Sequence, residues 1–368
     1  MSDSGQITLP PLTKASHASH CNRCLQGLPA GQIEVDASRV AIGFYSLGSL
    51  DLLGLLQSKT IDAEREAWRV WLWQQQASGS YGTGFKGSSY MTGHDRDPVV
   101  DYSEYDTPNL IMSYTSLLSL AILRDDLANL DRIGLIQFIK SCQRDDGSFS
   151  ALPNGGESDL RCVYCAFTIS SMLDDWSGID LERSIAYIRR CESYEGGYGQ
   201  APYGEALGGT TYCALASLHL APDSPTRLAT WITPAHRART IRWLMQNQGE
   251  DGGFSGRTNK ISDACYCFWC GASLAILGLG EDVDSEALAG FISQCQFKFG
   301  GIAKAPEARP DPYHTYMSVA AMSVLPPSIP TDDWTLPPLD VLWNATKETV
   351  AWLRAHVTEA GIAAAHAS

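Results

Sequence analysis

The sequence predicts an all-α fold, an α/α barrel (toroid) of repeated helix pairs with about 50 residues per repeat. One order of features recurs along the chain: a turn with glycine, an aromatic or apolar anchor residue, a polar loop, and a helix of small and apolar residues. The anchors lie 49, 56 and 48 residues apart, at Phe149, Tyr198, Phe254 and Ile302. Between the anchors, two kinds of predicted helix alternate.

The first kind of helix forms the second half of each repeat. An early copy of the repeat contains Phe85 and Asn109, with a longer insert between them. Four further copies span residues 143–167, 195–218, 250–277 and 298–325. Their second halves are apolar or small nearly all round, so these helices are expected to be buried on every side. They are the predicted inner helices of the barrel.

The second kind of helix is amphipathic. Residues 130–143, 181–192, 237–248 and 284–296 each combine one apolar stripe with a charged face, which predicts an outer ring. Because no Pro/Ser-rich linker interrupts the series, residues 21–356 are predicted to form a single domain. Residues 1–20 are predicted to be disordered, and residues 357–368 to form a frayed, Ala-rich tail.

Composition narrows the class of protein. The 368 residues carry a net charge of −14, which argues against nucleic-acid binding because no broad basic surface is available for phosphates. Eleven cysteines, an odd number, are typical of reduced thiols in a cytoplasmic protein. No apolar run opens the sequence, and its longest apolar stretch, residues 264–280, is interrupted by Gly271 and Ser273. We therefore expect neither a secretory signal nor a transmembrane segment.

A closed ring of helix pairs has one further consequence. All inner helices point the same way, so their N-termini gather at one mouth, where unpaired N–H groups and helix dipoles favour an anion. Residues twelve positions past the anchors are equivalent in the repeat. These are Arg161, Thr210, Tyr266 and His314, and we expect them around this mouth.

The stretch "KISDACYCFWCG", residues 260–271, contains a candidate metal site. Asp263 and Cys265 converge if Asp263 caps a helix that has Cys265 in its first turn. His314 opens the equivalent helix one repeat later, so it approaches the same point. Asp, Cys and His are three mixed zinc ligands, and they leave a fourth position open, as catalytic zinc sites do.

Other sulfur and imidazole groups compete with this interpretation. Cys267 and Cys270 share one side of an inner helix, where cysteine is more often a small hydrophobic residue. The stretch "HASHCNRC", residues 17–24, offers two histidines and two cysteines, but it precedes the repeats and is also typical of an ordinary helix. Spacing alone leaves these alternatives open.

At these residues the sequence resembles the β subunits of the protein prenyltransferases, most closely those of type I geranylgeranyltransferases. The resemblance covers almost the whole chain, through "SRVAIGFYSLGSLDLL", "GFKGSSY", "DLRCVYCA", "GRTNKISDACYCFW" and "GGIAKAP" with the later "YH". It implies an obligate α subunit and transfer of an isoprenoid from geranylgeranyl diphosphate to a cysteine. That cysteine belongs to a C-terminal CaaX motif, typically ending in Leu or Phe, on proteins such as Rho-type small GTPases.

The resemblance also implies roles for single residues. Asp263, Cys265 and His314 match the family's ligands for one zinc ion per β subunit. Matches to diphosphate contacts are Arg257, Lys260 and Tyr266. Lys304 stands where farnesyltransferases have an acidic residue that helps to hold magnesium. A lysine there would take the place of magnesium in contact with the diphosphate, so we expect activity without magnesium.

Further matches concern the isoprenoid and the peptide. The isoprenoid-lining positions are Arg161, Cys213, Trp269 and Ala41, the last in place of a tryptophan that shortens the pocket in farnesyltransferases. An arginine on an apolar inner helix is costly without a partner or ligand, which points independently to function at Arg161. Tyr45 and Tyr313 match the peptide pocket, and Leu207 departs from the family by replacing a histidine that contacts diphosphate.

Three alternatives remain. A farnesyltransferase β subunit is favoured by Tyr313 and opposed by Lys304 and Ala41. A terpene cyclase is suggested by "QRDDGSF", residues 143–149, but the chain lacks a convincing D-x-D-D acid motif. A non-catalytic helical-toroid scaffold would hold no stoichiometric metal.

Overall fold

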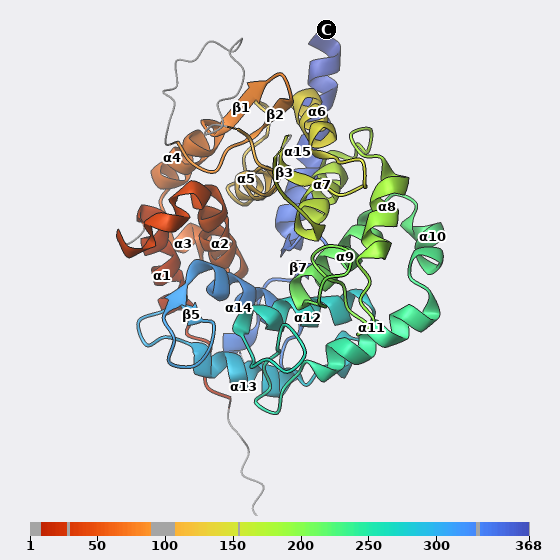
Figure 1. Ribbon diagram of the computed structural model, residues 1–368. Helices are drawn as coiled ribbons and strands as arrows, with labels where there is room; N and C mark the ends of the chain where they lie inside the picture. Colours follow the sequence, from red (N-terminus) through yellow and green to blue (C-terminus); the bar gives the residue numbers. More distant parts are fainter. Residues whose placement is uncertain (1–8, 28–29, 90–106, 154, 329–331, 368) are drawn as a thin grey trace, which may run out of the picture.

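The computed structural model describes residues 9–27, 30–89, 107–153, 155–328 and 332–367, and these form two concentric rings of helices (Figure 1). In these ranges the inner ring consists of α2 (Arg39–Leu52), α5 (Leu110–Ile122), α7 (Leu160–Leu173), α9 (Gly208–Leu220), α12 (Ala264–Ile276) and α14 (Pro312–Val324). Each inner helix contacts the next, and α14 contacts α2, so the ring closes. The prediction of an all-α toroid is confirmed.

The outer ring surrounds the inner helices (Figure 1). It consists of α1 (Lys14–Gln26), α4 (Asp62–Trp73), α6 (Arg132–Cys142), α8 (Leu181–Arg190), α11 (Pro234–Gln246) and α13 (Ser285–Cys295). The predicted amphipathic segments coincide with α6, α8, α11 and α13. Shorter or peripheral helices are α3 (Leu56–Lys59), α10 (Ser224–Trp231), α15 (Lys347–Ala367) and the 3₁₀ turns η1 (Ala30–Ser38), η2 (Gly280–Asp282) and η3 (Asp332–Trp334).

Small antiparallel hairpins lie in the connections. They pair β1 (Gln76–Gly79) with β2 (Gly82–Phe85), β3 (Ser150–Leu152) with β4 (Gly155–Ser158), β5 (Ile302–Ala303) with β6 (Pro310–Asp311), and β7 (Leu339–Asp340) with β8 (Ala345–Thr346). Most of the insert predicted between Phe85 and Asn109, residues 90–106, lies outside the described residues. In the described ranges, no helix combines the length and the hydropathy that a membrane span requires.

The sequence anchors are equivalent in space as well. All four are fully buried, and each forms an antiparallel bridge with a residue that follows an outer helix. These bridges join Gln143 to Phe149, Glu192 to Tyr198, Gln248 to Phe254 and Gln296 to Ile302. Each anchor therefore fixes the turn between an outer helix and the inner helix after it.

Backbone hydrogen bonds bring the N-termini of the inner helices to one mouth. The N–H of the first residue of an inner helix donates to a carbonyl in the loop that precedes the next inner helix. The pairs are Leu160 N with Gln200 O (3.1 Å), Gly208 N with Gly256 O (2.9 Å) and Ala264 N with Lys304 O (2.8 Å). Because each bond links one helix start to the neighbouring start, these helices point the same way, as the repeat predicts.

Polar side chains cap most of these helices. Asn109, Asp159, Asp263 and Asp311 each accept a hydrogen bond from a first-turn N–H of α5, α7, α12 and α14. Leu207 occupies the same position before α9 and offers no side-chain cap. Asp and Asn are favoured at this position because their oxygens pair with N–H groups that have no partner within the helix.

The chain ends differ from the prediction. Residues 1–8 lie outside the described residues, but α1 begins at Lys14, within the segment predicted to be disordered. It is held because His17 and Cys21 are buried, and the Nδ1 atom of His17 accepts a hydrogen bond from Gly301 N at 3.0 Å. At the other end, α15 continues to Ala367 where a frayed tail was predicted.

Candidate metal centre

Asp263 caps α12 in the conformation that the sequence predicts. Its backbone is extended (φ −143°, ψ 132°), and its Oδ1 atom accepts a hydrogen bond from Cys265 N at 3.0 Å. The backbone N–H of Asp263 donates to Phe254 O, which ties the cap to an anchor residue. Asp263 and Cys265 therefore converge at the mouth although they lie two residues apart.

His314 reaches the same point from the neighbouring helix α14. Its Nε2 atom lies 3.3 Å from Asp263 Oδ1, and the ligand atoms of Asp263, Cys265 and His314 all lie within 4.8 Å of one another. In the described ranges this is the one group of three or more such side chains. Tetrahedral zinc with ligands at about 2.0–2.3 Å accepts O, N and S donors of this kind. The predicted convergence is confirmed, and the three residues can hold a metal ion.

Asp311 completes the site and was not predicted from the sequence. It caps α14 by accepting a hydrogen bond from His314 N, and its Oδ2 atom lies 2.6 Å from His314 Nδ1. A carboxylate on the second ring nitrogen fixes the orientation and tautomer of a metal-binding histidine. Nε2 is thereby left to face Asp263 and Cys265.

Without a metal ion, the site retains protons. Burial acts to lower the pKa of His314, but hydrogen bonds to Asp263 and Asp311 outweigh it and raise that pKa to about 11. Burial raises the pKa of the Cys265 thiol, also to about 11, against the opposing effect of His314. For Asp263, burial acts to raise the pKa, but contacts with His314 and Cys265 N–H outweigh it and lower the pKa.

The protonation of His314 and Cys265 in the metal-free site predicts how metal affinity depends on pH. His314 and Cys265 must each lose one proton to act as ligands, and both pKa values lie above neutrality. We expect metal affinity to rise by about a hundredfold per pH unit between about pH 6 and pH 8, because about two protons are released on binding. Chelator competition across this range measures the slope, and a flat profile would contradict the assigned ligands.

Asp311→Asn tests the supporting carboxylate. The amide keeps the shape of the side chain but removes the charge that faces His314. Loss of such a supporting group typically weakens metal binding by about 10–100-fold, which is the expected change in the dissociation constant. The matched control is Asp159→Asn, which alters the cap of α7 away from the metal site. Equal affinity in Asp311→Asn and the unsubstituted chain would show that Asp311 acts only as a cap.

A pocket of about 260 Å³ adjoins the candidate metal centre at Asp263. Its lining includes Asp263 and the four residues that were predicted to contact diphosphate: Arg257, Lys260, Tyr266 and Lys304. A backbone hydrogen bond fixes Lys304 beside α12, because its carbonyl oxygen accepts the N–H of Ala264. Arg257 Nη1 pairs with Glu205 Oε2 at 3.1 Å. Three cations therefore surround one hollow beside the candidate metal centre.

Aromatic side chains of neighbouring inner helices contact one another. Trp269 Nε1 donates a hydrogen bond to Tyr313 Oη at 2.9 Å. The rings of Tyr45 and Tyr313 lie 5.2 Å apart, and those of Tyr212 and Trp269 lie 5.0 Å apart. Two further isoprenoid candidates, Cys213 on α9 and Ala41 on α2, are buried with 5% and 7% of their surface exposed.

The environment of Arg161 differs from the one that the sequence predicted. Its guanidinium contacts Asp159 Oδ2 at 2.6 Å and also pairs with Glu157, and its side chain is 44% exposed. These carboxylates offset the charge of Arg161, so a bound ligand is not needed to explain an arginine on this helix. The argument from uncompensated charge was wrong, and the role of Arg161 rests on the resemblance alone.

The competing clusters do not form metal sites in the described residues. Cys267 and Cys270 are fully buried, and their thiols face Asp263 O and Ser255 O rather than each other. His20 Nε2 and Cys24 Sγ lie 3.7 Å apart on α1, but His17 is engaged by Gly301 and Gln296. No third ligand joins His20 and Cys24 in the described ranges.

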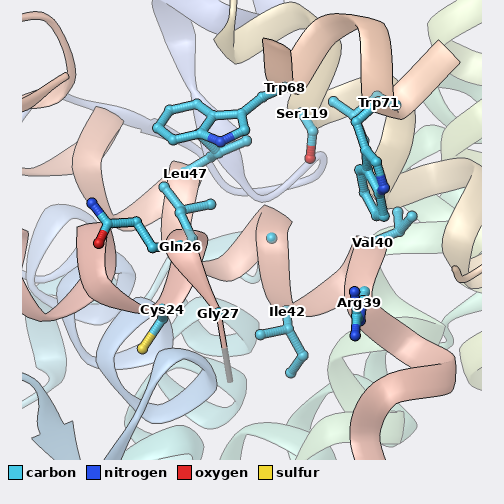
Figure 2. A pocket seen from close by; sticks show the side chains of 13 residues that line it. Cys24, Gln26, Gly27, Arg39, Val40, Ile42, Leu47, Trp68, Trp71 and Ser119 are labelled. Atoms are coloured by element: carbon cyan, nitrogen blue, oxygen red, sulfur yellow. The ribbon is translucent and has the colours of Figure 1, made fainter. Parts of the chain in front are cut away.

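A larger hollow lies on the outer side of α2. It encloses about 540 Å³ between α1, α2 and α4, with Trp68 and Trp71 at one side and Arg39 at the other (Figure 2). Its described lining is mostly apolar, and none of Asp263, Cys265 and His314 contributes to it. Candidate chemistry therefore lies at the smaller pocket at the mouth.

Comparison with known proteins places this geometry in context. The family described as the prenyltransferase alpha-alpha toroid domain matches residues 12–348. A geranylgeranyl transferase type-1 subunit beta from Arabidopsis thaliana is 42% identical over 231 residues, which are 60% of this chain and 60% of that protein. The Dictyostelium discoideum protein of the same name is 36% identical over 323 residues, 83% of this chain and 89% of that protein.

Two further relatives bear on the choice of branch. A protein farnesyltransferase subunit beta from Schizosaccharomyces pombe is 32% identical over 327 residues, 83% of this chain and 76% of that protein. A solved structure of Candida albicans protein geranylgeranyltransferase-I complexed with GGPP has a TM-score of 0.83. It is 26% identical, and the match covers 95% of this chain and 100% of that chain.

Proposed function

We propose that this chain, which belongs to the prenyltransferase alpha-alpha toroid family, is the catalytic β subunit of a type I protein geranylgeranyltransferase. The observation that carries the proposal is the convergence of Asp263, Cys265 and His314 beside a pocket with three cations. Relatives named for type I activity are 42% and 36% identical, against 32% for a farnesyltransferase subunit. The proposed reaction joins a geranylgeranyl group to the cysteine of a CaaX protein.

The proposed metal is one zinc ion, held by Asp263, Cys265 and His314. When bound, zinc lowers the pKa of a thiol in its open position, so that the substrate cysteine reacts as a thiolate near neutral pH. Asp311 orients His314 for this task through the contact with Nδ1. The mixed O, S and N donor set, within 4.8 Å, supports zinc over magnesium, which prefers oxygen ligands.

Arg257, Lys260 and Lys304 are proposed to hold the diphosphate that leaves. Negative charge grows on the diphosphate as its bond to the isoprenoid breaks, and fixed cations lower the barrier when they surround that charge. Tyr266, in the same pocket, offers a hydroxyl donor. Lys304 supplies a cation where the resemblance places a magnesium ligand in farnesyltransferases, so the proposed reaction needs no magnesium.

An α subunit is the proposed partner, and the mouth has a surface that suits one. The loops before α9, α12 and α14 expose Tyr194, Tyr203, Ile261 and Phe299, each more than half accessible. Large apolar side chains exposed around one opening are typical of an interaction surface. We further propose that the complex acts in the cytoplasm on CaaX proteins, including small GTPases of the Rho type.

Donor choice is proposed to depend on Ala41. Ala41→Trp would fill space beside α2 that one more five-carbon unit needs, and burying that unit is worth roughly 3–4 kcal/mol. We expect the ratio of kcat/KM for geranylgeranyl over farnesyl diphosphate to fall by at least about a hundredfold. Ala41→Val serves as the graded control and should give an intermediate ratio. An unchanged ratio in both variants would exclude this role for Ala41.

The direct test co-expresses this chain with a prenyltransferase α subunit. Farnesyl and geranylgeranyl diphosphates then compete for peptides that end in Leu or Met. Preferred transfer of geranylgeranyl to the Leu peptide supports the proposal. Preferred farnesylation of the Met peptide would assign the chain to the farnesyltransferase branch. A complex that holds no metal and transfers neither group would leave only the toroid architecture.

A further inference from the structure

Two of the three cations beside the candidate metal centre, Arg257 and Lys260, lie on one short loop, residues 256–262. We call this segment the cation loop. An antiparallel bridge between Ser255 and Ser262 closes its base. Within the loop, the backbone N–H of Lys260 donates to Arg257 O at 3.3 Å. Both charges are therefore carried by one turn, and the shape of that turn decides where they lie.

The backbone of the cation loop is fixed where it meets α9 and α12. Gly256 lies against the ring of Tyr266 on α12, and a Cβ atom at this position would come within 2.1 Å of Tyr266 Cζ. Its carbonyl oxygen accepts the N–H of Gly208, the first residue of α9, at 2.9 Å. Asn259 has φ +60°, a left-handed conformation that asparagine adopts more readily than most residues. The loop is thus a tight turn packed against two inner helices.

Thr258 fixes the middle of the cation loop from the other side. Its Oγ1 atom accepts a hydrogen bond from Trp243 Nε1 at 3.3 Å and donates one to Glu195 Oε2 at 2.7 Å. Trp243 lies on α11 and is only 4% exposed, so Thr258 supplies the acceptor that a buried indole N–H requires. Glu195 lies in the connection between α8 and α9. One hydroxyl therefore ties the turn between the two cations to the preceding repeat.

The contacts of Thr258 differ in kind from those of the cations. Arg257 Nη1 pairs with Glu205 Oε2, but these side chains are 44% and 52% exposed, and exposed ion pairs are weak. An incoming anion can therefore displace Glu205 from Arg257. Thr258 is not in the described lining of the pocket, and its hydrogen bonds involve neither cation. The tie through Thr258 can thus persist while an anion is bound.

We propose that Thr258 is a positioning residue that presets Arg257 and Lys260 for the diphosphate. The proposal rests on the proposed function, because it assumes that the pocket beside Asp263 receives a diphosphate. Thr258 acts through the two cations by holding the turn that carries them before the anion arrives. Cations that are already in place need no rearrangement as negative charge grows on the leaving group, and such preorganisation lowers the barrier.

The test compares Thr258→Val with the unsubstituted chain, each in complex with an α subunit. Valine keeps the shape of the side chain but removes the hydroxyl that serves Trp243 and Glu195. We expect the dissociation constant of inorganic pyrophosphate to rise by about tenfold and the single-turnover transfer rate to fall by about tenfold, because small displacements of positioned groups are costly. Metal content should not change. Thr258→Ser restores the hydroxyl and should recover most of both losses.

A double-mutant cycle separates positioning from general stabilisation of the fold. In a chain that already carries Arg257→Ala/Lys260→Ala, the further change Thr258→Val should alter the transfer rate by less than about twofold, because the groups through which Thr258 acts are gone. A tenfold further loss in that chain would show that Thr258 only stabilises the fold, and would overturn the proposal. Unchanged pyrophosphate affinity in Thr258→Val alone would overturn it as well.

Thr83→Val is the matched control. The Oγ1 atom of Thr83 also donates to a carboxylate, Asp131 Oδ2 at 2.6 Å, but it lies on β2 and is not in the described lining of the pocket. This variant should keep its pyrophosphate affinity and transfer rate. An unsubstituted complex that binds no pyrophosphate would overturn the proposed function. Pyrophosphate bound equally well by that complex and by Thr258→Val would overturn only the role of Thr258.

Discussion

His314→Ala is expected to abolish metal retention and prenyl transfer together. The imidazole supplies one of the three proposed protein ligands, and Asp263 and Asp311 would be left facing each other across the gap. Loss of a mere supporting group weakens metal binding by about 10–100-fold, so loss of a ligand should weaken it by at least about a hundredfold. Metal analysis after dialysis should give under about 0.1 ion per complex, against about one for the unsubstituted complex.

The control for this variant is His219→Ala. His219 also lies on an inner helix, at the C-terminal end of α9, where its Nδ1 atom contacts Leu215 O. This substitution should leave metal content and transfer rate unchanged. Metal retained at full occupancy in His314→Ala would refute the assigned centre, whatever happens to the rate.

Replacing Lys260 and Lys304 together with alanine should slow transfer without releasing the metal. Both ammonium groups border the pocket beside Asp263, and neither is a metal ligand. Removing one preorganised partner of a developing negative charge typically costs about 10²–10³ in kcat, so the double variant should lose at least about a hundredfold. The measurement is single-turnover transfer in buffer without magnesium, in which the unsubstituted complex should keep its full rate.

Lys298→Ala is the matched control for charge. Lys298 is a cation of the same rim, but it lies over the ring of Phe299 instead of bordering the pocket. A rate loss in Lys298→Ala equal to that of the double variant would mean that total charge matters, not the pocket. A double variant with normal kcat would remove these two lysines from the chemistry.

Much of the fold and of the metal site could be predicted because they follow from periodicity. The spacing of Phe149, Tyr198, Phe254 and Ile302 reflects a turn that is rebuilt in each repeat. Asp263 could be recognised as a helix cap, and the period then placed His314 beside it. Both inferences need only backbone geometry, which the repeat imposes.

The missed features depend on side-chain contacts that no spacing encodes. Asp311 supports His314 only because that ring turns its Nδ1 atom back toward the cap. Arg161 is balanced by Asp159, a cap whose second role is invisible in the sequence. The start of α1 was missed because His17, a polar residue, fills a buried position and accepts a hydrogen bond from Gly301.

Ring closure between α14 and α2 has a consequence for biogenesis. His314 is carried by the inner helix that emerges last from the ribosome, whereas its packing partner α2 is made among the first. A nascent chain therefore presents Asp263 and Cys265 before the proposed third ligand exists, and the site is complete only once α14 has packed against α12. Because the same helix also closes the ring against α2, ion binding should accompany the packing of the last inner helix and report on late folding.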